Sequence, residues 1–189
     1  QRLNNLANQE WHSDSSFKKI PSKMSILSAK MIPSLGGNTE FLSMRASYNA
    51  LPQELKLKID DKICWHDYSH GRSKIDPNLV TPEEKQALPP VKQKLVLSDN
   101  KHGKSLYLGA HCRNVDGMSE NDSNALLAEI NSYIDTEKFI YSHVWEPFDL
   151  IMWDNRAVLH RATPIKGKIE KRLMVRTTVA GQASTIDVY

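Results

Sequence analysis

The spacing of hydrophobic residues changes along the chain, and each spacing predicts a different kind of element. The stretch from Ser119 to Ile134 repeats apolar residues at helical spacing, and Ser119 is placed to cap that helix. Short β-rich runs bounded by turn residues predict strands instead, most densely towards the end of the chain. The predicted strands are Ser25–Met31, Thr39–Leu42, Leu95–Leu97, Leu106–His111, Phe139–Trp145, Asp149–Asp154, Val158–Thr163 and Leu173–Ala180.

Turn residues suggest how some of these strands are connected. Gly36-Gly37-Asn38 follows the first predicted strand and predicts a hairpin with the second. Lys166-Gly167-Lys168 predicts another turn, between two of the last strands. From Met44 onwards the pattern becomes helical, so we expect one or two short helices around Pro52 that cover a sheet face.

The stretch from Cys64 to Pro90 shows the least regular pattern and is rich in His, Asp, Ser and Pro. Within it, Thr81-Pro82-Glu83-Glu84 has the residues of a capping box with Pro at the first helical position. We therefore expect a long excursion that contains one short helix. Excursions of this length are uncommon unless they serve as lids or binding loops.

Short strands with helices set apart from them predict an α+β fold that is mainly β. The specific expectation is a double-stranded β-helix (jelly-roll) core with flanking helices. A chain of 189 residues fits one domain, which we place over residues 1–189. Because a motif with metal-ligating residues begins only at His12, we also expect that an N-terminal portion of the barrel is lacking.

Composition and charge exclude several classes of protein. The net charge of +3 comes from scattered lysines rather than a basic arm, so we expect a small anionic substrate and no nucleic acid. No apolar run approaches the roughly 20 residues of a membrane span, so no membrane partner is expected. Cys64 and Cys112 have no metal-knuckle spacing, which fits a reducing cytoplasm. Homo-oligomerisation is left open.

His12 and Asp14 form a pair that needs a distant partner, and His160 is available for that role. On an extended strand, residues two apart point to the same face. A later strand that brought His160 alongside would complete a 2-His-1-carboxylate facial triad, which holds Fe(II) and leaves positions open for oxygen chemistry. Taken alone, the same residues also fit solvated or core histidines.

Arg172 and Arg176 follow His160 on a predicted strand, where their spacing puts both side chains on one face. One interpretation is a solvated strand face. The other is that both point inward, where burial would be costly unless they met carboxylates, the groups that a guanidinium binds through two hydrogen bonds.

These residues belong to a set of motifs that resembles the taurine dioxygenase family of Fe(II)/2-oxoglutarate-dependent oxygenases. The resemblance covers almost the whole chain in the same order. The segment from Asn8 to Phe17 and Leu88-Pro-Pro-Val91 are more similar to the 2,4-dichlorophenoxyacetate dioxygenase branch. The motifs are His12-Ser-Asp14, Gly36-Gly37-Asn38-Thr39, Lys104-Ser-Leu-Tyr-Leu-Gly109, Met152-Trp-Asp-Asn-Arg156 with His160, and Arg172 to Arg176.

The resemblance implies a role for each matching residue. His12, Asp14 and His160 would be iron ligands. Thr39 and Arg172 would hold the distal carboxylate of the cosubstrate 2-oxoglutarate. Arg176 would bind that cosubstrate or an anionic group of the substrate, and Asn8 and Trp153 would line the site.

The implied activity is a dioxygenase that uses Fe(II), 2-oxoglutarate and O2 to hydroxylate a small anionic substrate, releasing succinate and CO2. Two other classes remain open: a non-catalytic jelly-roll protein that binds a metal or a carboxylate, and a zinc or manganese hydrolase or isomerase with the same ligands. His66 and His70 are four apart without a third ligand, so a loop or substrate-contacting role is favoured over a second metal site. For His111 and Cys112, facing the pocket and ordinary packing both remain open.

Overall fold

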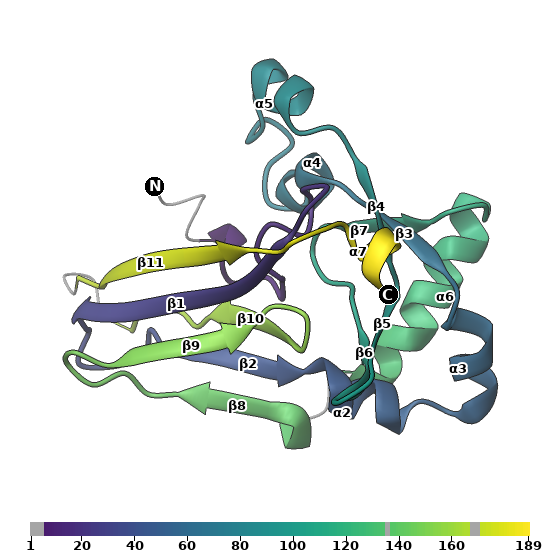
Figure 1. Ribbon diagram of the computed structural model, residues 1–189. Helices are drawn as coiled ribbons and strands as arrows, with labels where there is room; N and C mark the ends of the chain where they lie inside the picture. The colour runs from purple at the N-terminus through teal and green to yellow at the C-terminus, as the bar shows by residue number, and fades with distance from the viewer. Residues whose placement is uncertain (1–5, 135–136, 167–170) are drawn as a thin grey trace.

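The computed structural model describes residues 6–134, 137–166 and 171–189. Its longer strands gather on one side, and most of its helices lie on the other (Figure 1). Strands hold 34% of the described residues and helices 28%. The fold is therefore mixed, without the strong excess of strand that the sequence predicts. Much of the helix lies in short pieces such as α2 (Met44–Ala50) and α3 (Gln53–Ile59), whose periodic pattern spans only two turns.

One sheet has the strand order β11-β1-β9 and is antiparallel throughout. Its strands are β1 (Ser22–Met31), β9 (Leu150–Asp154) and β11 (Leu173–Ala180). Side chains alternate between its two faces, so Leu150 and Met152 lie on an outer, exposed face. Ser25 pairs with Trp153 and Leu27 with Arg176 on the other face, which is the face that carries the candidate site.

The second sheet has the order β10-β2-β8, built from β2 (Thr39–Ser43), β8 (Ile140–His143) and β10 (Val158–Ala162). Phe41 on β2 lies opposite His160 on β10. The ring of Trp153, from the first sheet, lies with its centroid 5.3 Å from that of Phe41 and 4.7 Å from that of His160. The two sheets therefore face each other through these side chains.

The predicted hairpin between the first two strands is wrong. Strand β1 pairs with β11 and β9, whereas β2 pairs with β10 and β8. The turn is present, but it binds a distant segment: Gly36 forms a bridge with Ile165, and the Gly37 N–H donates to the Pro164 carbonyl at 3.0 Å. Both glycines have φ near +70 to +80°, a conformation in which other residues are strained.

The rest of the chain forms two small sheets and a helical layer. The sheets have the orders β4-β3-β7 and β5-β6. Helix α6 matches its prediction, and the Ser119 hydroxyl caps it by accepting the Asp122 N–H at 3.2 Å. The bounds are β3 (Ile63–His66), α4 (Tyr68–Ser73), α5 (Pro82–Ala87), β4 (Val91–Lys94), β5 (Val96–Asp99), β6 (Gly103–Leu106), β7 (Cys112–Val115), α6 (Glu120–Ile134), η1 (Glu137–Phe139) and α7 (Thr185–Val188).

The hydrophobic core lies between the helical layer, the small sheets and one face of the second sheet, to which Leu42 and Leu159 belong, and not between the two three-stranded sheets. It leaves the space between those sheets to the polar residues of the candidate site. Its fully buried members include Leu42, Met44, Ile59, Leu95, Leu106, Leu126 and Ile130.

Two other stretches of the chain differ from their predictions. The excursion from Cys64 to Pro90 contains the predicted helix α5 with its capping box, but also β3 and α4. Strand β3 has only four residues and is held by β4 and β7, which lie far along the chain. The predicted strand Leu106–His111 is also wrong, because β6 ends at Leu106 and the next strand starts at Cys112. The predicted turn at 166–168 lies mostly outside the described residues.

Among the described residues, no helix is both long enough and apolar enough to span a membrane.

Candidate metal centre

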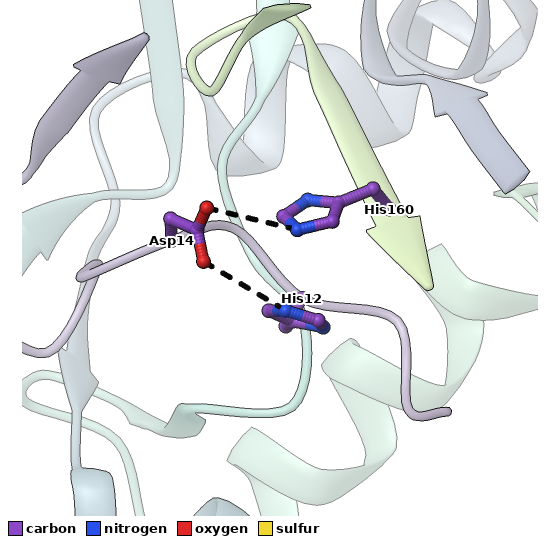
Figure 2. Close-up of side chains that lie close together, drawn as sticks. All are labelled: His12, Asp14 and His160. Atoms are coloured by element: carbon purple, nitrogen blue, oxygen red, sulfur yellow. Dashed lines mark ion pairs between the residues drawn. The ribbon is translucent and has the colours of Figure 1, made fainter. Parts of the chain in front are cut away.

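The side chains of His12, Asp14 and His160 converge on one point (Figure 2). The His12 Nε2 lies 3.9 Å from Asp14 Oδ1, and the His160 Nε2 lies 3.8 Å from Asp14 Oδ2. One candidate ligand atom from each residue falls within 4.8 Å of the others. Within the described ranges, this is the one group of three or more His, Cys, Asp or Glu residues that meets this condition.

The backbone brings the two histidines together. The His12 N–H donates to the His160 carbonyl at 3.1 Å, and the His160 N–H donates back to the His12 carbonyl at 2.9 Å. His12 pairs with β10 only through this isolated antiparallel bridge. Asp14, two residues later, already lies in a turn. The expectation of an extended strand over His12 to Asp14 is thus wrong, although the two side chains still meet.

The protonation of the histidines suits metal ligation. Burial is the main cause that lowers the pKa of His12, and it lowers the pKa of His160 well below the ordinary value. Both rings are therefore neutral at pH 7. The His12 Nδ1 lies 2.7 Å from the Glu10 carbonyl, which can only accept, so Nδ1 carries the proton and the Nε2 lone pair faces Asp14.

Beside the two histidines, Arg172 and Thr39 form a second cluster, here called the cradle. The Arg172 Nε donates to the Gly37 carbonyl at 2.9 Å, and its Nη2 donates to Thr39 Oγ1 at 3.1 Å. The Trp145 Nε1 also donates to Thr39 Oγ1, at 3.0 Å. Arg172 directly precedes β11, and in the described part of the chain no carboxylate pairs with it, although burial lowers its pKa. A partly buried cation without an acidic partner favours an anionic ligand.

The two histidines of the triad and the cradle line one cavity of about 200 Å³. That volume suits a small molecule. Apolar side chains from the first sheet and polar ones from both sheets face it. Its lining residues are Asn8, His12, Leu27, Thr39, Trp153, His160, Arg161, Ala162, Arg172, Met174 and Arg176.

The structure places the other predicted site residues as follows. Arg176 lies on β11 and donates from Nη1 to Asp14 Oδ1 at 2.7 Å. Asn8 lines the cavity and is anchored by its carbonyl, which accepts the Ala162 N–H at 2.8 Å. A second hollow on the other side of the triad is lined by Arg72 and His111, among others. The excursion therefore does reach the site, through α4.

The remaining histidine and cysteine candidates do not join the triad. His66 is fully buried and stacks on Tyr107 with ring centroids 5.5 Å apart. His70 belongs to no three-residue metal group in the described chain. Cys112 packs in the hydrophobic core, so ordinary packing is the correct interpretation for it. Sequence reasoning gave no role to Trp145, Ser25 or Asn155, because their contacts join segments far apart in the chain.

We expect stability to fall in acid because of His66. Burial lowers its pKa to about 4, against an ordinary value of about 6.5. The unfolded chain therefore takes up a proton between pH 6.5 and 4 that the folded chain does not, so the free energy of unfolding falls by up to about 3 kcal/mol across that window. His66→Phe removes this contribution, whereas the other buried histidines with a lowered pKa, such as His111, keep theirs.

Urea unfolding at pH 7, 5.5 and 4.5 measures the effect as the difference between the two proteins. His102→Phe, at an exposed position in the turn between β5 and β6, is the control and leaves the pH dependence unchanged. Parallel pH curves for the His66→Phe and unaltered proteins would contradict the prediction.

Comparison with known proteins places these motifs among dioxygenases. A family described as "Taurine catabolism dioxygenase TauD, TfdA family" matches residues 2–178. The chain is 38% identical over 178 residues to the alpha-ketoglutarate-dependent 2,4-dichlorophenoxyacetate dioxygenase of Cupriavidus pinatubonensis, covering 94% of this chain and 62% of that protein. It is 30% identical to the (S)-phenoxypropionate/alpha-ketoglutarate-dioxygenase of Sphingobium herbicidovorans, covering 94% and 64%.

A solved structure agrees in both fold and sequence. The structure of AAD-2 in complex with Mn(II) and N-oxalylglycine superposes with a TM-score of 0.90 at 43% identity, covering 98% of this chain and 73% of that one. The chain spans between 60% and 64% of the length of three of the curated relatives that it matches.

Proposed function

Because this chain belongs to the TauD, TfdA family, we propose that it is an Fe(II)- and 2-oxoglutarate-dependent dioxygenase. It hydroxylates a small anionic organic substrate and releases succinate and CO2. The observation that carries the proposal is that one cavity of about 200 Å³ is lined both by histidines of the triad and by Arg172, which pairs with no carboxylate among the described residues. A protein that only binds a metal, without oxygenase activity, has no need of Arg172 in the same cavity.

The residues present fit Fe(II). Two neutral imidazoles and one carboxylate, with ligand atoms that converge within 4.8 Å, are the donor set of a non-haem iron oxygenase. His12, Asp14 and His160 would hold the ion. When bound, Fe(II) together with 2-oxoglutarate supplies the oxidation chemistry, in which O2 is reduced while the cosubstrate loses CO2 and the substrate gains a hydroxyl group.

The cradle binds the far carboxylate of 2-oxoglutarate. Arg172 is held rigidly by its bond to Gly37, which leaves the remaining guanidinium hydrogens for a carboxylate. Thr39 Oγ1 already accepts from Trp145 and Arg172, so both of its lone pairs are used. Its own hydrogen must therefore point away from both donors and is available to the cosubstrate.

Arg176 and Asn8 are the residues that contact the substrate. Arg176 is half exposed, with 52% of its side chain accessible, and it lines the cavity next to the triad. A guanidinium at this position attracts an acid group and orients the rest of the substrate towards the metal. The two curated relatives are named for phenoxyacetate and phenoxypropionate substrates, so we propose aryloxyalkanoic acids as the first class to test.

Aromatic rings form the wall of the cavity beside the metal ligands and shield that side from water. Trp153 lies 4.7 Å from His160 and 5.3 Å from Phe41 between ring centroids, so the wall beside the metal ligands is apolar. Exclusion of water strengthens the electrostatic hold on the cosubstrate and limits side reactions.

The jelly-roll core and the cytoplasmic location are also part of this proposal. Two antiparallel three-stranded sheets that face each other across the site support a double-stranded β-helix. Two cysteines that are buried and free, Cys64 and Cys112, support a reducing compartment.

Oxygen-dependent release of succinate tests the proposal. The protein is supplied with Fe(II), ascorbate and 2-oxoglutarate, and succinate is measured with and without a panel of aryloxyacetic and aryloxypropionic acids. We expect release that needs O2 and increases with a matching acid. A hydrolase or isomerase would convert its substrate equally well without O2, and a binding protein would release no succinate under either condition.

We expect Trp145→Phe to weaken 2-oxoglutarate binding about 2- to 10-fold, the value of one neutral hydrogen bond. Without the Trp145 donor, the Thr39 hydroxyl is free to rotate and no longer points only at the cosubstrate. The dissociation constant is read from the weak visible charge-transfer band of the anaerobic Fe(II) and 2-oxoglutarate complex. Trp65→Phe is the matched control, since Trp65 lies on β3 and donates to Asp116, just after β7. Equal affinities in both variants would contradict the prediction.

A further inference from the structure

The carboxylate of Asp14 is held from behind by a chain of buried hydrogen bonds. The Ser25 Oγ donates to Asp14 Oδ2 at 2.6 Å, and the Asn155 Nδ2 donates to Ser25 Oγ at 2.9 Å. Ser25 is fully buried, Asn155 is 1% exposed and Asp14 is 5% exposed. Since water does not compete with these bonds, they fix the Oδ2 side of the carboxylate, while Arg176 Nη1 bonds Oδ1 from the more exposed side.

The chemistry of the partners fixes the direction of each bond. The Asn155 Oδ1 accepts the Asp14 N–H at 3.2 Å and the Trp153 Nε1–H at 3.1 Å, and both of these groups can only donate. The amide oxygen must therefore face them, which turns the Asn155 NH2 group towards Ser25. The Ser25 oxygen receives that donor, so its own hydrogen is directed to the Asp14 carboxylate.

The same asparagine also joins three segments of the chain. It lies in the turn between β9 and β10, while Ser25 lies on β1 and Asp14 lies in the N-terminal segment. The Ser13 Oγ also donates to the Asn155 carbonyl, at 2.8 Å. Asn155 therefore bonds two successive residues of the N-terminal segment, Ser13 and Asp14. Asn155 therefore sets the position of the Asp14 main chain as well as the orientation of its side chain.

We propose that Ser25 and Asn155 are positioning residues that pre-orient the Asp14 carboxylate for the metal. This inference rests on the proposed function, because the metal is the one held by His12, Asp14 and His160. A carboxylate whose Oδ2 is tied to Ser25 loses rotation about its side-chain bonds before the ion arrives. The ion then binds without the cost of ordering that ligand.

The test is titration with Co(II), whose visible d–d absorption reports both affinity and ligand geometry without turnover. We expect Ser25→Ala to raise the Co(II) dissociation constant about 10- to 100-fold and to change the absorption spectrum. Ser25→Thr keeps the hydroxyl and restores both the affinity and the spectrum. Asn155→Asp replaces the donor to Ser25 with an acceptor, which draws the Ser25 hydrogen away from Asp14 and produces the same loss as Ser25→Ala.

Ser47→Ala is the matched control. Ser47 lies in α2, outside the cavity, and is also fully buried. Its hydroxyl donates to the carbonyl of Ser43, the last residue of β2. Thermal unfolding of all variants shows whether a weaker affinity reflects the site or a general loss of stability. An equal loss of affinity in Ser47→Ala would overturn the inference.

The positioning role and the proposed function are contradicted by different results. If Ser25→Ala binds Co(II) as tightly as the unaltered protein and with the same spectrum, the positioning role is wrong and the proposed function stands. If the unaltered protein binds Co(II) no more tightly than His160→Ala does, the triad holds no metal. In that case the proposed function fails, and the inference fails with it.

Discussion

His160→Ala is expected to abolish tight metal binding and, with it, all succinate release. His160 supplies one of three converging ligand atoms, and its Nε2 lies 3.8 Å from Asp14. Removing a partner that only supports a ligand typically costs 10- to 100-fold in metal affinity, so removing a ligand itself costs more than 100-fold. The charge-transfer band of the anaerobic Fe(II) and 2-oxoglutarate complex disappears.

The matched control is His102→Ala, which changes an exposed histidine in the turn between β5 and β6. It retains the band at full strength. Circular dichroism and thermal unfolding confirm that both variants are folded. A band of unchanged intensity in His160→Ala would place the iron elsewhere and remove the basis for the proposed function.

Arg172→Ala is expected to weaken 2-oxoglutarate binding about 30-fold or more while leaving the metal in place. The guanidinium is partly buried, is oriented by Gly37, and has no acidic partner in the described chain. Truncating one partner of a buried, hydrogen-bonded charge pair costs about 2–5 kcal/mol, which corresponds to about 30-fold to several thousand-fold. Arg172→Lys retains the charge but loses the two-pronged geometry, so we expect its 2-oxoglutarate affinity to lie between those of Arg172→Ala and the unaltered protein.

The measurement separates the cosubstrate from the metal. Co(II) affinity without 2-oxoglutarate stays within a few-fold of that of the unaltered protein, whereas the 2-oxoglutarate dissociation constant rises. Arg113→Ala, which removes an arginine whose side chain is 56% exposed, is the control and changes neither value. If 2-oxoglutarate binds Arg172→Ala normally, then Arg176 holds the cosubstrate and the assignments of the two arginines must be exchanged.

The sequence by itself determined the elements whose pattern is local. Helix α6 and its Ser119 cap follow from apolar residues at helical spacing, and the capping box of α5 follows from four adjacent residues. Most strands of the two three-stranded sheets also lie where the β-rich runs predict them. The chemistry of the triad was readable too, because metal ligation requires specific residue types, and the surrounding motifs narrow the choice of family.

Only the tertiary structure decided which strands pair and what surrounds the ligands. Strand β1 pairs with β11 rather than with β2. Backbone hydrogen-bonding groups are the same in nearly every residue, so they do not select a partner strand. The choice depends on which faces of the strands become buried in the complete fold. Asp14 lies in a turn rather than on a strand, so the spacing of two residues gave the correct result through an incorrect geometry.

The residues that support the ligands show the same limit. Ser25 lies 11 residues from Asp14, and Asn155 lies 141 residues from it, so no local pattern marks either contact. Trp145 reaches Thr39 across 106 residues. A hydrogen bond depends on distance and direction in space, which a sequence carries only through the complete fold. The sequence therefore named the candidate ligands, and the tertiary structure decided which buried groups contact them.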